Sequence, residues 1–305
     1  MGQEITRREL FKLAGGGAVA WGLGKLGLNG DSAAEAAQQP LLVVARNQSP
    51  AAMVRAVFKG LGGIGKFLKP GGVVVIKPNA AWQRRPEQAG NTNPEVAAEV
   101  VRICKEGGAK IVKVIDHPVA KPASISFKTN GLKTAVERAG AIMIDGSSRS
   151  LYRPLRIPRG RVLKSSHVLK DVMDADLFIN LPIAKVHNAI PYTIGFKNLM
   201  GVTLDRGAFH NSPDLGQAIV DYATEVRPHL TIVDAVRALL TNGPQGPGKI
   251  KDANMLIAGT DPLAVDAYTV RHVFDQNPEK VAYLRYASRS GLGELDLKKV
   301  TVKDV

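Results

Sequence analysis

The sequence has little of several residue types, and each shortage excludes a class of protein. Its 305 residues contain a single cysteine, Cys104. One thiol cannot form an internal disulfide, and an iron–sulfur cluster needs about four cysteine ligands, so we expect no iron–sulfur cluster held by this chain alone. The weakly apolar stretch 13–28 is interrupted by six glycines and Lys25. It falls short of the roughly 20 consecutive apolar residues that a membrane-spanning helix needs.

Acidic residues are outnumbered by basic ones, 27 to 41, which gives a net charge of +14. Such an excess favours a small anionic ligand, an acidic redox partner or an anionic membrane surface. Nucleic acid is not expected as a partner, because the basic residues are dispersed. Aromatic residues, only 5% of the chain, do not interleave with them to stack on bases.

Phosphate-binding loops are also missing, although two glycine-rich segments have a similar spacing. After segment 60–66 the position of the magnesium-binding hydroxyl is taken by Phe67, and a predicted helix precedes the glycines where a strand is needed. After segment 243–249 the same position is Ile250, and prolines within the segment remove backbone N–H groups. We expect this second segment to be a rigid loop at the entrance of a site.

Residues 1–37 have the features of an export signal. The adjacent Arg7 and Arg8 precede the weakly apolar stretch, and an Ala-rich segment follows at 32–37. A charged start, an apolar middle and small residues at the end are the three parts of a secretory signal, and the arginine pair indicates the twin-arginine pathway. We predict a signal peptide over residues 1–37, export by the twin-arginine machinery, and a periplasmic or other extracytoplasmic location. An uncleaved signal would tether the protein to the membrane.

The rest of the chain, residues 38–305, alternates between apolar runs and helical patterns, which is typical of an α/β protein. Continuous Val/Ile runs such as 73–76 favour strands buried on both faces of a mostly parallel sheet, with helices on both sides. The predicted strands are 41–45, 73–77, 111–115, 141–144, 176–180, 230–233 and 255–258. The predicted helices are 51–69, 94–106, 128–139, 214–225, 262–273 and 278–288. We expect a single domain, with a possible seam between two intimate lobes near 121–170.

Polar side chains follow four of the predicted strands. Their carboxyl ends lead into Lys77 and Asn79, into Asp116 and His117, into Lys185 and His187, and into Asp234. Because ligands of open α/β sheets bind at the carboxyl ends of the strands, these residues indicate a common site. Simpler structural roles remain open: Asn79 could shape a turn, Asp116 and His117 could cap the next segment, and Asp234 could start a helix over 235–240.

Segment 185–210 has the highest density of candidate residues, with His187, Lys197, Asn198 and His210 in addition to Lys185. Imidazole is a common ligand of transition metals. His187 and His210, joined by Asp116 or His117, could form a metal site with an open position. The lysines suit an anion, and a buried lysine among other cations could act as a base or nucleophile. A solvated basic loop is the alternative.

The order of these motifs resembles the domain-of-unknown-function family 362 over nearly all of residues 38–305. The matching segments are Lys77–Asn79, Thr92–Glu95, Asn180–Pro182 with Lys185 and His187, Lys197–Gly201, Ile232–Ala235, Asn242–Pro244 with Gly246, and Asp261–Pro262 with Ala264–Asp266. Many relatives carry ferredoxin-type cysteine motifs, and this sequence departs from them there. More remotely, the plan is similar to the nickel-dependent lactate racemase family, which uses histidine and lysine around a metal-bearing cofactor.

These observations predict an exported protein with a metal- or anion-binding site at the strand ends. If it is an enzyme on a small anionic substrate, Lys185, His187 and Lys197 are the candidate catalytic residues. Lys77, Asn79, Asn198 and Asp234 are the candidates for holding a cofactor or orienting the site. Asp116, His117, His187 and His210 are the candidate metal ligands, for a transition metal. The alternative is a non-catalytic periplasmic protein that binds a metal or anion, or a redox accessory protein.

Overall fold

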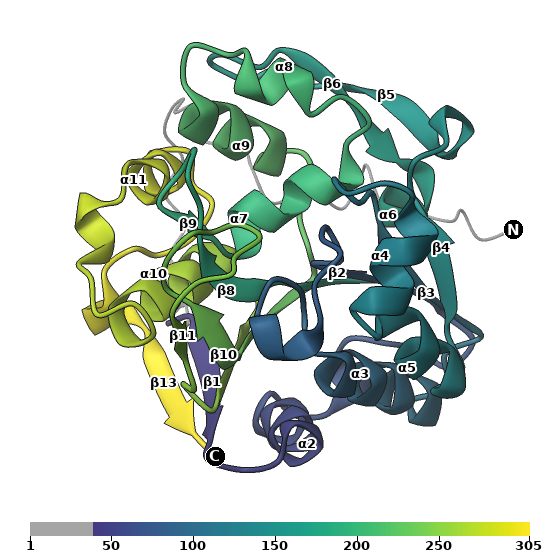
Figure 1. The fold of residues 1–305 in the computed structure, drawn as a ribbon. Coiled ribbons are helices and arrows are strands. Elements are labelled where there is room, and N and C mark those ends of the chain that lie inside the picture. The colour runs from purple at the N-terminus through teal and green to yellow at the C-terminus, as the bar shows by residue number, and fades with distance from the viewer. Residues whose placement is uncertain (1–38) are drawn as a thin grey trace, which may run out of the picture. The chain divides into compact units, whose positions relative to one another are not determined.

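The computed structural model of the protein describes residues 39–305, and the predicted signal peptide lies outside the described residues. The apolar runs form one large sheet (Figure 1). Its strands are β1 (Leu41–Arg46), β2 (Val73–Pro78), β3 (Ile111–Asp116), β4 (Ile142–Asp145), β7 (Leu177–Leu181), β8 (Ile183–Val186), β9 (Tyr192–Thr193), β10 (Leu230–Leu239), β11 (Ile250–Lys251), β12 (Met255–Gly259) and β13 (Thr301–Asp304).

The sheet has a parallel centre and a mixed edge. Its main strand order is β13-β1-β12-β10-β7-β2-β3-β4, and neighbours from β10 to β4 all run parallel. Strand β12 is antiparallel to both β10 and β1, while β13 is parallel to β1. The predicted mostly parallel sheet is confirmed. The carboxyl ends of β2 and β3 therefore meet at one edge.

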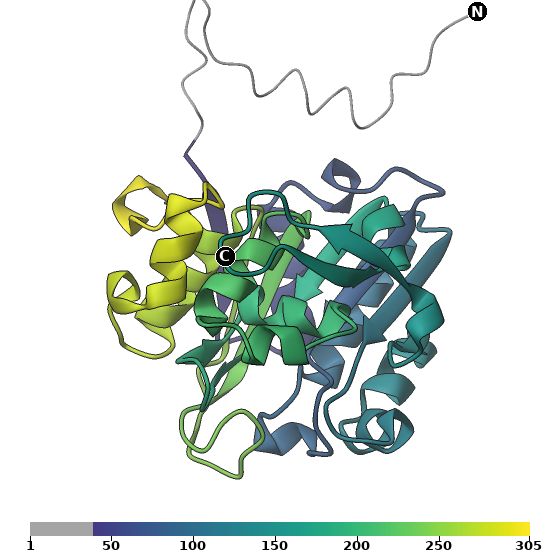
Figure 2. The same ribbon diagram turned by 90° about the horizontal axis from the view of Figure 1, so that it is seen from above.

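Helices cover both faces of the sheet (Figures 1 and 2). One face carries α2 (Pro50–Gly60), α3 (Pro94–Glu106), α4 (Ala123–Thr129) and α5 (Leu132–Arg138). The other carries α7 (Gly195–Asn198), α9 (Leu215–Ala223), α10 (Pro262–His272) and α11 (Ala282–Arg289). Successive strand residues alternate between the two apolar cores: Val74 and Ile76 belong to the first core and Val75 to the second. This alternation follows from the two-residue period of a strand.

Glycine and proline end or divide helices where the helical pattern continues. The helix predicted over 51–69 ends at Gly60, and the pattern over 128–139 is divided into α4 and α5. Gly131 lies at the division with a φ of 75°, a left-handed conformation that favours glycine. The pattern over 278–288 is split into a 3-10 turn, Pro278–Lys280, and α11, with Val281 in an extended conformation between them.

No helix starts at Asp234, contrary to that alternative. Strand β10 continues to Leu239, because Asp234 and Ala235 pair with β12 and the strand then pairs with β8 and β11. Nine of the ten residues of β10 are buried. Tertiary pairing therefore overrides the helical pattern of 235–240.

Strands β5 (Tyr152–Arg156) and β6 (Ser165–Leu169) form a separate antiparallel hairpin. The loop between them is held by Asp221 of α9, whose Oδ2 accepts the backbone N–H groups of Arg161, Val162 and Leu163 at 2.7, 2.7 and 2.9 Å. The helices α6 (Lys170–Asp174) and α8 (Gly207–His210) flank the same region. Residues 39–305 form one compact unit, and segment 121–170 contributes α4, α5, β4 and the hairpin to it. Among the described residues, no helix is both long and apolar enough to cross a membrane.

Candidate functional site

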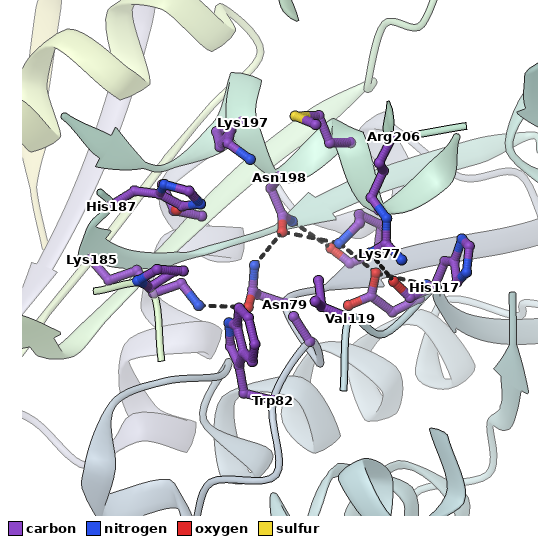
Figure 3. Close-up of a pocket in the computed structure, with 16 residues that line it drawn as sticks. Lys77, Asn79, Trp82, His117, Val119, Lys185, His187, Lys197, Asn198 and Arg206 are labelled. Atoms are coloured by element: carbon purple, nitrogen blue, oxygen red, sulfur yellow. Dashed lines mark hydrogen bonds and ion pairs between the residues drawn. The ribbon is translucent and has the colours of Figure 1, made fainter. Parts of the chain in front are cut away.

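A small pocket lies at the carboxyl ends of β2 and β3, beside β8 and under α7 (Figure 3). Its volume is about 60 Å³, roughly four times the space that one water needs by the same measure. The lining residues are Lys77, Asn79, Ala81, Trp82, Asp116, His117, Val119, Lys185, His187, Thr193, Lys197, Asn198, Met200, Gly201, Arg206 and Pro244. Eight of the predicted site residues therefore meet in one place, and Pro244 brings the 243–249 loop to it.

A buried ion pair occupies one end of the pocket. Lys77 Nζ lies 3.0 Å from Asp116 Oδ1, and both side chains are at most 2% exposed. Asp116 also accepts the backbone N–H groups of Ala80 at 2.6 Å and His117 at 2.9 Å. Burial lowers the pKa of Lys77, and the Asp116 charge acts in the opposite direction. Asp116 thus joins the loops that follow β2 and β3.

Asparagines connect this pair to the rest of the pocket. Asn198 Oδ1 accepts hydrogen bonds from Lys77 Nζ and from Asn79 Nδ2, both at 3.0 Å. Asn198 Nδ2 donates to Asn180 Oδ1 at 2.8 Å, and Asn180 Nδ2 donates to the backbone oxygen of Gly195 at 2.9 Å. Asn79 and Asn198 therefore link the buried ion pair to Lys185.

Lys185 is buried and has no carboxylate partner among residues 39–305. Its Nζ donates to Asn79 Oδ1 at 3.0 Å and to the Gly90 backbone oxygen at 2.6 Å. Burial, followed by the nearby charge of Lys197, holds the pKa of Lys185 well below its ordinary value. A charged form of Lys185 would lack full compensation in the protein alone.

Lys197 projects into the pocket from α7 and is 9% exposed. Within residues 39–305 its ammonium group has no hydrogen-bond or ion-pair partner, and Figure 3 shows its nitrogen facing the open centre. Burial, with the charges of Arg206 and Lys77, lowers the pKa of Lys197 to about 8. Arg206, on the opposite side, donates to the backbone oxygens of His117 at 2.8 Å and Pro118 at 3.2 Å.

The start of α7 is held by Asp266 of α10. Its carboxylate accepts the backbone N–H groups of Gly195 at 2.8 Å and Phe196 at 3.2 Å. A Cβ at Gly195 would lie 2.7 Å from Asp266 Oδ1, so glycine is needed for this approach. Burial raises the pKa of Asp266 to about 7. This contact positions the helix that carries Lys197 and Asn198.

His187 is a hydrogen-bond donor toward the pocket. The backbone N–H of Ala189 donates to its Nδ1 at 3.0 Å, so the neutral ring carries its proton on Nε2. Burial, together with the charges of Lys197, Lys185 and His210, lowers the pKa of His187 to about 3. A neutral ring with a protonated Nε2 offers the pocket a donor rather than a metal-ligating lone pair.

The predicted metal ligands are not assembled. Among residues 39–305, no three His, Cys, Asp or Glu side chains come together in a way that could hold a metal ion. Asp116 is engaged with Lys77, His117 Nδ1 faces the Thr203 backbone oxygen at 3.4 Å, and His210 does not line the pocket. The side chains that gather here are mainly cationic, which repels a metal ion.

Asp234 also lies outside the pocket lining. Its carboxylate accepts the backbone N–H groups of Asn93 at 2.7 Å and Val236 at 3.0 Å, and Asn93 caps helix α3. Burial raises the pKa of Asp234 to about 6. Asp234 therefore supports the start of α3 instead of contacting a ligand, because its strand continues past the sheet edge where the pocket lies.

Sequence reasoning missed several lining residues, most importantly Thr193, Gly201 and Arg206. The Thr193 hydroxyl is buried and has no hydrogen-bond partner among the described residues. Arg206 follows the Lys197–Gly201 motif by a few residues, and no pattern distinguished it from the surface arginines. Gly201 ends that motif, and its role is steric: a Cβ there would overlap Asp116 Oδ1 and lie 2.6 Å from Lys77 Nζ.

The fold and pocket define an α/β protein with a cation-lined site at the carboxyl ends of parallel strands. Residues 74–271 match the family described as Domain of unknown function (DUF362), and the chain belongs to this family. A thylakoid-associated protein of Synechocystis is 29% identical over 257 residues, which cover 79% of this chain and 75% of that protein. The resemblance noted in the sequence is therefore confirmed.

Two solved structures were also found to be similar. The lactate racemase apoprotein of Thermoanaerobacterium thermosaccharolyticum has a TM-score of 0.47 and 13% identity, covering 72% of this chain and 54% of that one. A protein of Thermotoga maritima has a TM-score of 0.42 and 11% identity, covering 79% and 57%. The chain spans little more than half the length of each.

We predict that Gly201→Ala damages the site, because the new methyl group would push against the Lys77–Asp116 pair. The free energy of unfolding should fall by about 1–3 kcal/mol, the usual cost of overpacking, as measured by denaturant titration. Gly65→Ala is the matched control, since no atom lies within 4 Å of a Cβ at Gly65. Equal effects of the two substitutions would contradict the steric role of Gly201.

Proposed function

We propose that the protein binds a small anionic ligand in the pocket between β2, β3, β8 and α7. The observation that carries this proposal is the imbalance of charge around the cavity. Lys77, Lys185, Lys197 and Arg206 line it, and Asp116 is the only carboxylate among the lining residues. Since Asp116 is paired with Lys77, the other three cations are left without an anionic partner in the described part of the chain.

Burying cations in this way is costly unless an anion accompanies them. An anionic ligand would supply that partner, and its negative charge would favour the charged forms of Lys185 and Lys197. The neutral His187 ring would add an N–H donor from the side of β8, and Thr193 a free hydroxyl. A volume of about 60 Å³ suits a carboxylate- or phosphate-sized group rather than a nucleotide.

If the protein is an enzyme, Lys197 is the group best placed to move a proton. Its pKa of about 8 lies near neutral pH, where an acid–base group works efficiently, while Lys185 and His187 would bind and polarise the substrate. A non-catalytic anion-binding or accessory protein is the alternative. Turnover separates the two, because a binding protein only saturates with its ligand and forms no product.

Anion binding should weaken as the pH rises through the pKa of Lys197. Below about pH 8 the side chain is an ammonium ion, and above it the amine is neutral. From about pH 7 to about pH 9 the affinity for a bound anion should fall by about tenfold. Isothermal titration calorimetry with sulfate would measure this, since sulfate does not change its own charge in that range and cannot react with the amine.

Lys197→Arg, which stays charged, should remove this pH dependence, and Lys197→Met should bind weakly at every pH. Lys128→Met changes the same charge on an exposed lysine of α4 and should leave binding unchanged. Equal affinities in the wild type and Lys197→Met at neutral pH would argue against the pocket as the anion site.

We further propose that the protein reaches this ligand outside the cytoplasm, by twin-arginine export. The support is the arginine pair, the weakly apolar stretch and the Ala-rich segment in residues 1–37. This location would be periplasmic or otherwise extracytoplasmic, with a membrane tether if the signal is retained.

Replacing Arg7 and Arg8 together by lysine should keep the protein in the cytoplasm, because the export machinery reads the arginine pair rather than its charge. Cell fractionation and immunoblotting would measure the location of the full chain. Lys25→Arg, a conservative change outside the pair, serves as the control. Normal export of the double-lysine variant would refute the assignment of this pathway.

An anionic membrane surface is the partner that a second observation favours. Residues 149–170, here called the basic hairpin, contain Arg149, Arg153, Arg156, Arg159, Arg161, Lys164 and Lys170 and no acidic residue. Six of these seven side chains are exposed. Lipid headgroups of negative charge attract such clusters by about 1 kcal/mol per basic residue. The name of the Synechocystis relative, a thylakoid-associated protein, agrees with this proposal.

Changing Arg156, Arg159 and Arg161 to glutamine should reduce binding to phosphatidylglycerol vesicles by about tenfold or more. Co-sedimentation of the protein with vesicles at low salt would measure it. The control removes the same charge from exposed lysines elsewhere, Lys66, Lys69 and Lys298. A comparable loss in both triple variants would mean that net charge alone, and not the hairpin, attracts the membrane.

A further inference from the structure

The three lysines of the pocket differ in what their nitrogen atoms contact. Lys77 forms an ion pair with Asp116 and donates to Asn198. Lys185 donates to Asn79 and to the Gly90 backbone oxygen. Lys197 alone, among the lysines that line this pocket in the described part of the chain, has no acceptor for its nitrogen (Figure 3). Its amine faces the cavity and is available to a ligand.

The surroundings of Lys197 keep part of its population unprotonated. Burial and the charges of Arg206 and Lys77 both disfavour the ammonium form, and a lysine placed among other cations becomes a better nucleophile in this way. For a site that needed only positive charge, an arginine at this position would be more effective, because arginine stays protonated. A free amine in the cavity therefore indicates a role beyond charge.

The cations around Lys197 retain unused donors. Arg206 has five N–H groups, of which two are directed at backbone oxygens. Lys185 has three when protonated and uses two. These remaining donors can hold the carboxylate of a ligand while its neighbouring carbon faces Lys197. The small cavity leaves room for few further atoms.

We propose that Lys197 forms an imine with the carbonyl carbon of a small 2-oxo carboxylate bound in this pocket. The inference rests on the proposed anion site and names its substrate class. A 2-oxo carboxylate carries its carboxylate and its carbonyl on adjacent carbons, and this arrangement matches a cluster of cationic donors beside a free amine. Neither a simple anion nor a neutral ketone uses both features.

The reaction needs no oxidant or reductant. The lone pair of Lys197 Nζ attacks the carbonyl carbon, the π electrons of the C=O bond move to oxygen, and a proton passes from nitrogen to that oxygen. The resulting carbinolamine then loses its hydroxyl group with a proton, as one water, to give the imine. The Thr193 hydroxyl and the Nε2–H group of His187 both belong to the pocket lining and can donate to the oxygen during these steps.

Borohydride trapping tests the proposal. The purified protein is incubated with pyruvate near pH 8, reduced with sodium borohydride, digested and mapped by mass spectrometry. The imine would be reduced to a stable secondary amine, so one reduced pyruvate group should be found on the peptide that contains Lys197. Acetone, a ketone of similar size without the carboxylate, should label this lysine at least about tenfold less, a ratio equivalent to the contribution of one charge-assisted contact.

Lys197→Arg is the matched variant, because it keeps the charge but cannot form the imine. It should lose the adduct and still bind pyruvate in calorimetry. Pyruvate that binds to the wild type without an adduct on Lys197 would overturn the imine and leave the anion site intact. Labelling of many surface lysines, equal with acetone, would overturn it as well. Failure of every small anion to bind would instead refute the anion site itself.

Discussion

The buried ion pair between Lys77 and Asp116 is the contact on which the rest of the site depends. Asp116 accepts backbone N–H groups from Ala80 and His117, so one carboxylate fixes the loops after two neighbouring strands. Gly201 lets the segment after α7 lie directly over the pair. Losing one partner of such a pair typically costs about 3–5 kcal/mol, because it leaves a charge buried alone. The pair thus supports the structure of the site, while the other cations of the pocket have no carboxylate partner within residues 39–305.

The difference between the paired lysine and the other cations of the pocket could be predicted only in part from the sequence. Strand ends could be predicted because long Val/Ile runs stop at polar residues, and Lys77, Asn79, Asp116, Lys185 and His187 do meet in the pocket. Which lysine would be paired and which free could not be predicted, because it depends on distances between strands that are far apart in sequence. Arg206 was missed for the same reason: an arginine in a short connecting segment has no periodicity that indicates burial.

Asp234 and the histidines are placed differently in the structure from what the sequence pattern suggested, and each difference has a physical cause. Asp234 was expected at the sheet edge because the apolar run 230–233 stops there. The strand continues through 239, since pairing with β12 and then with β8 and β11 outweighs the helical pattern. The histidines were grouped as metal ligands because of their residue type. In the structure, His187 accepts a hydrogen bond from the backbone N–H group of Ala189, and burial, with the charges of Lys197 and Lys185, lowers its pKa. These surroundings, which the residue type alone does not reveal, keep the ring neutral.

The asparagines have a consequence that follows from the direction of their hydrogen bonds. From Lys185, each amide accepts on one side and donates on the other, through Asn79, Asn198 and Asn180, to the backbone oxygen of Gly195. An amide in such a series cannot rotate by itself, because its reversal would place two donors or two acceptors face to face. The orientation set by one lysine on β8 is therefore transmitted to the first residue of α7, the helix that carries Lys197. The hydrogen bonds of Lys185 and the position of the backbone that begins α7 are thus linked through the amides of three asparagines.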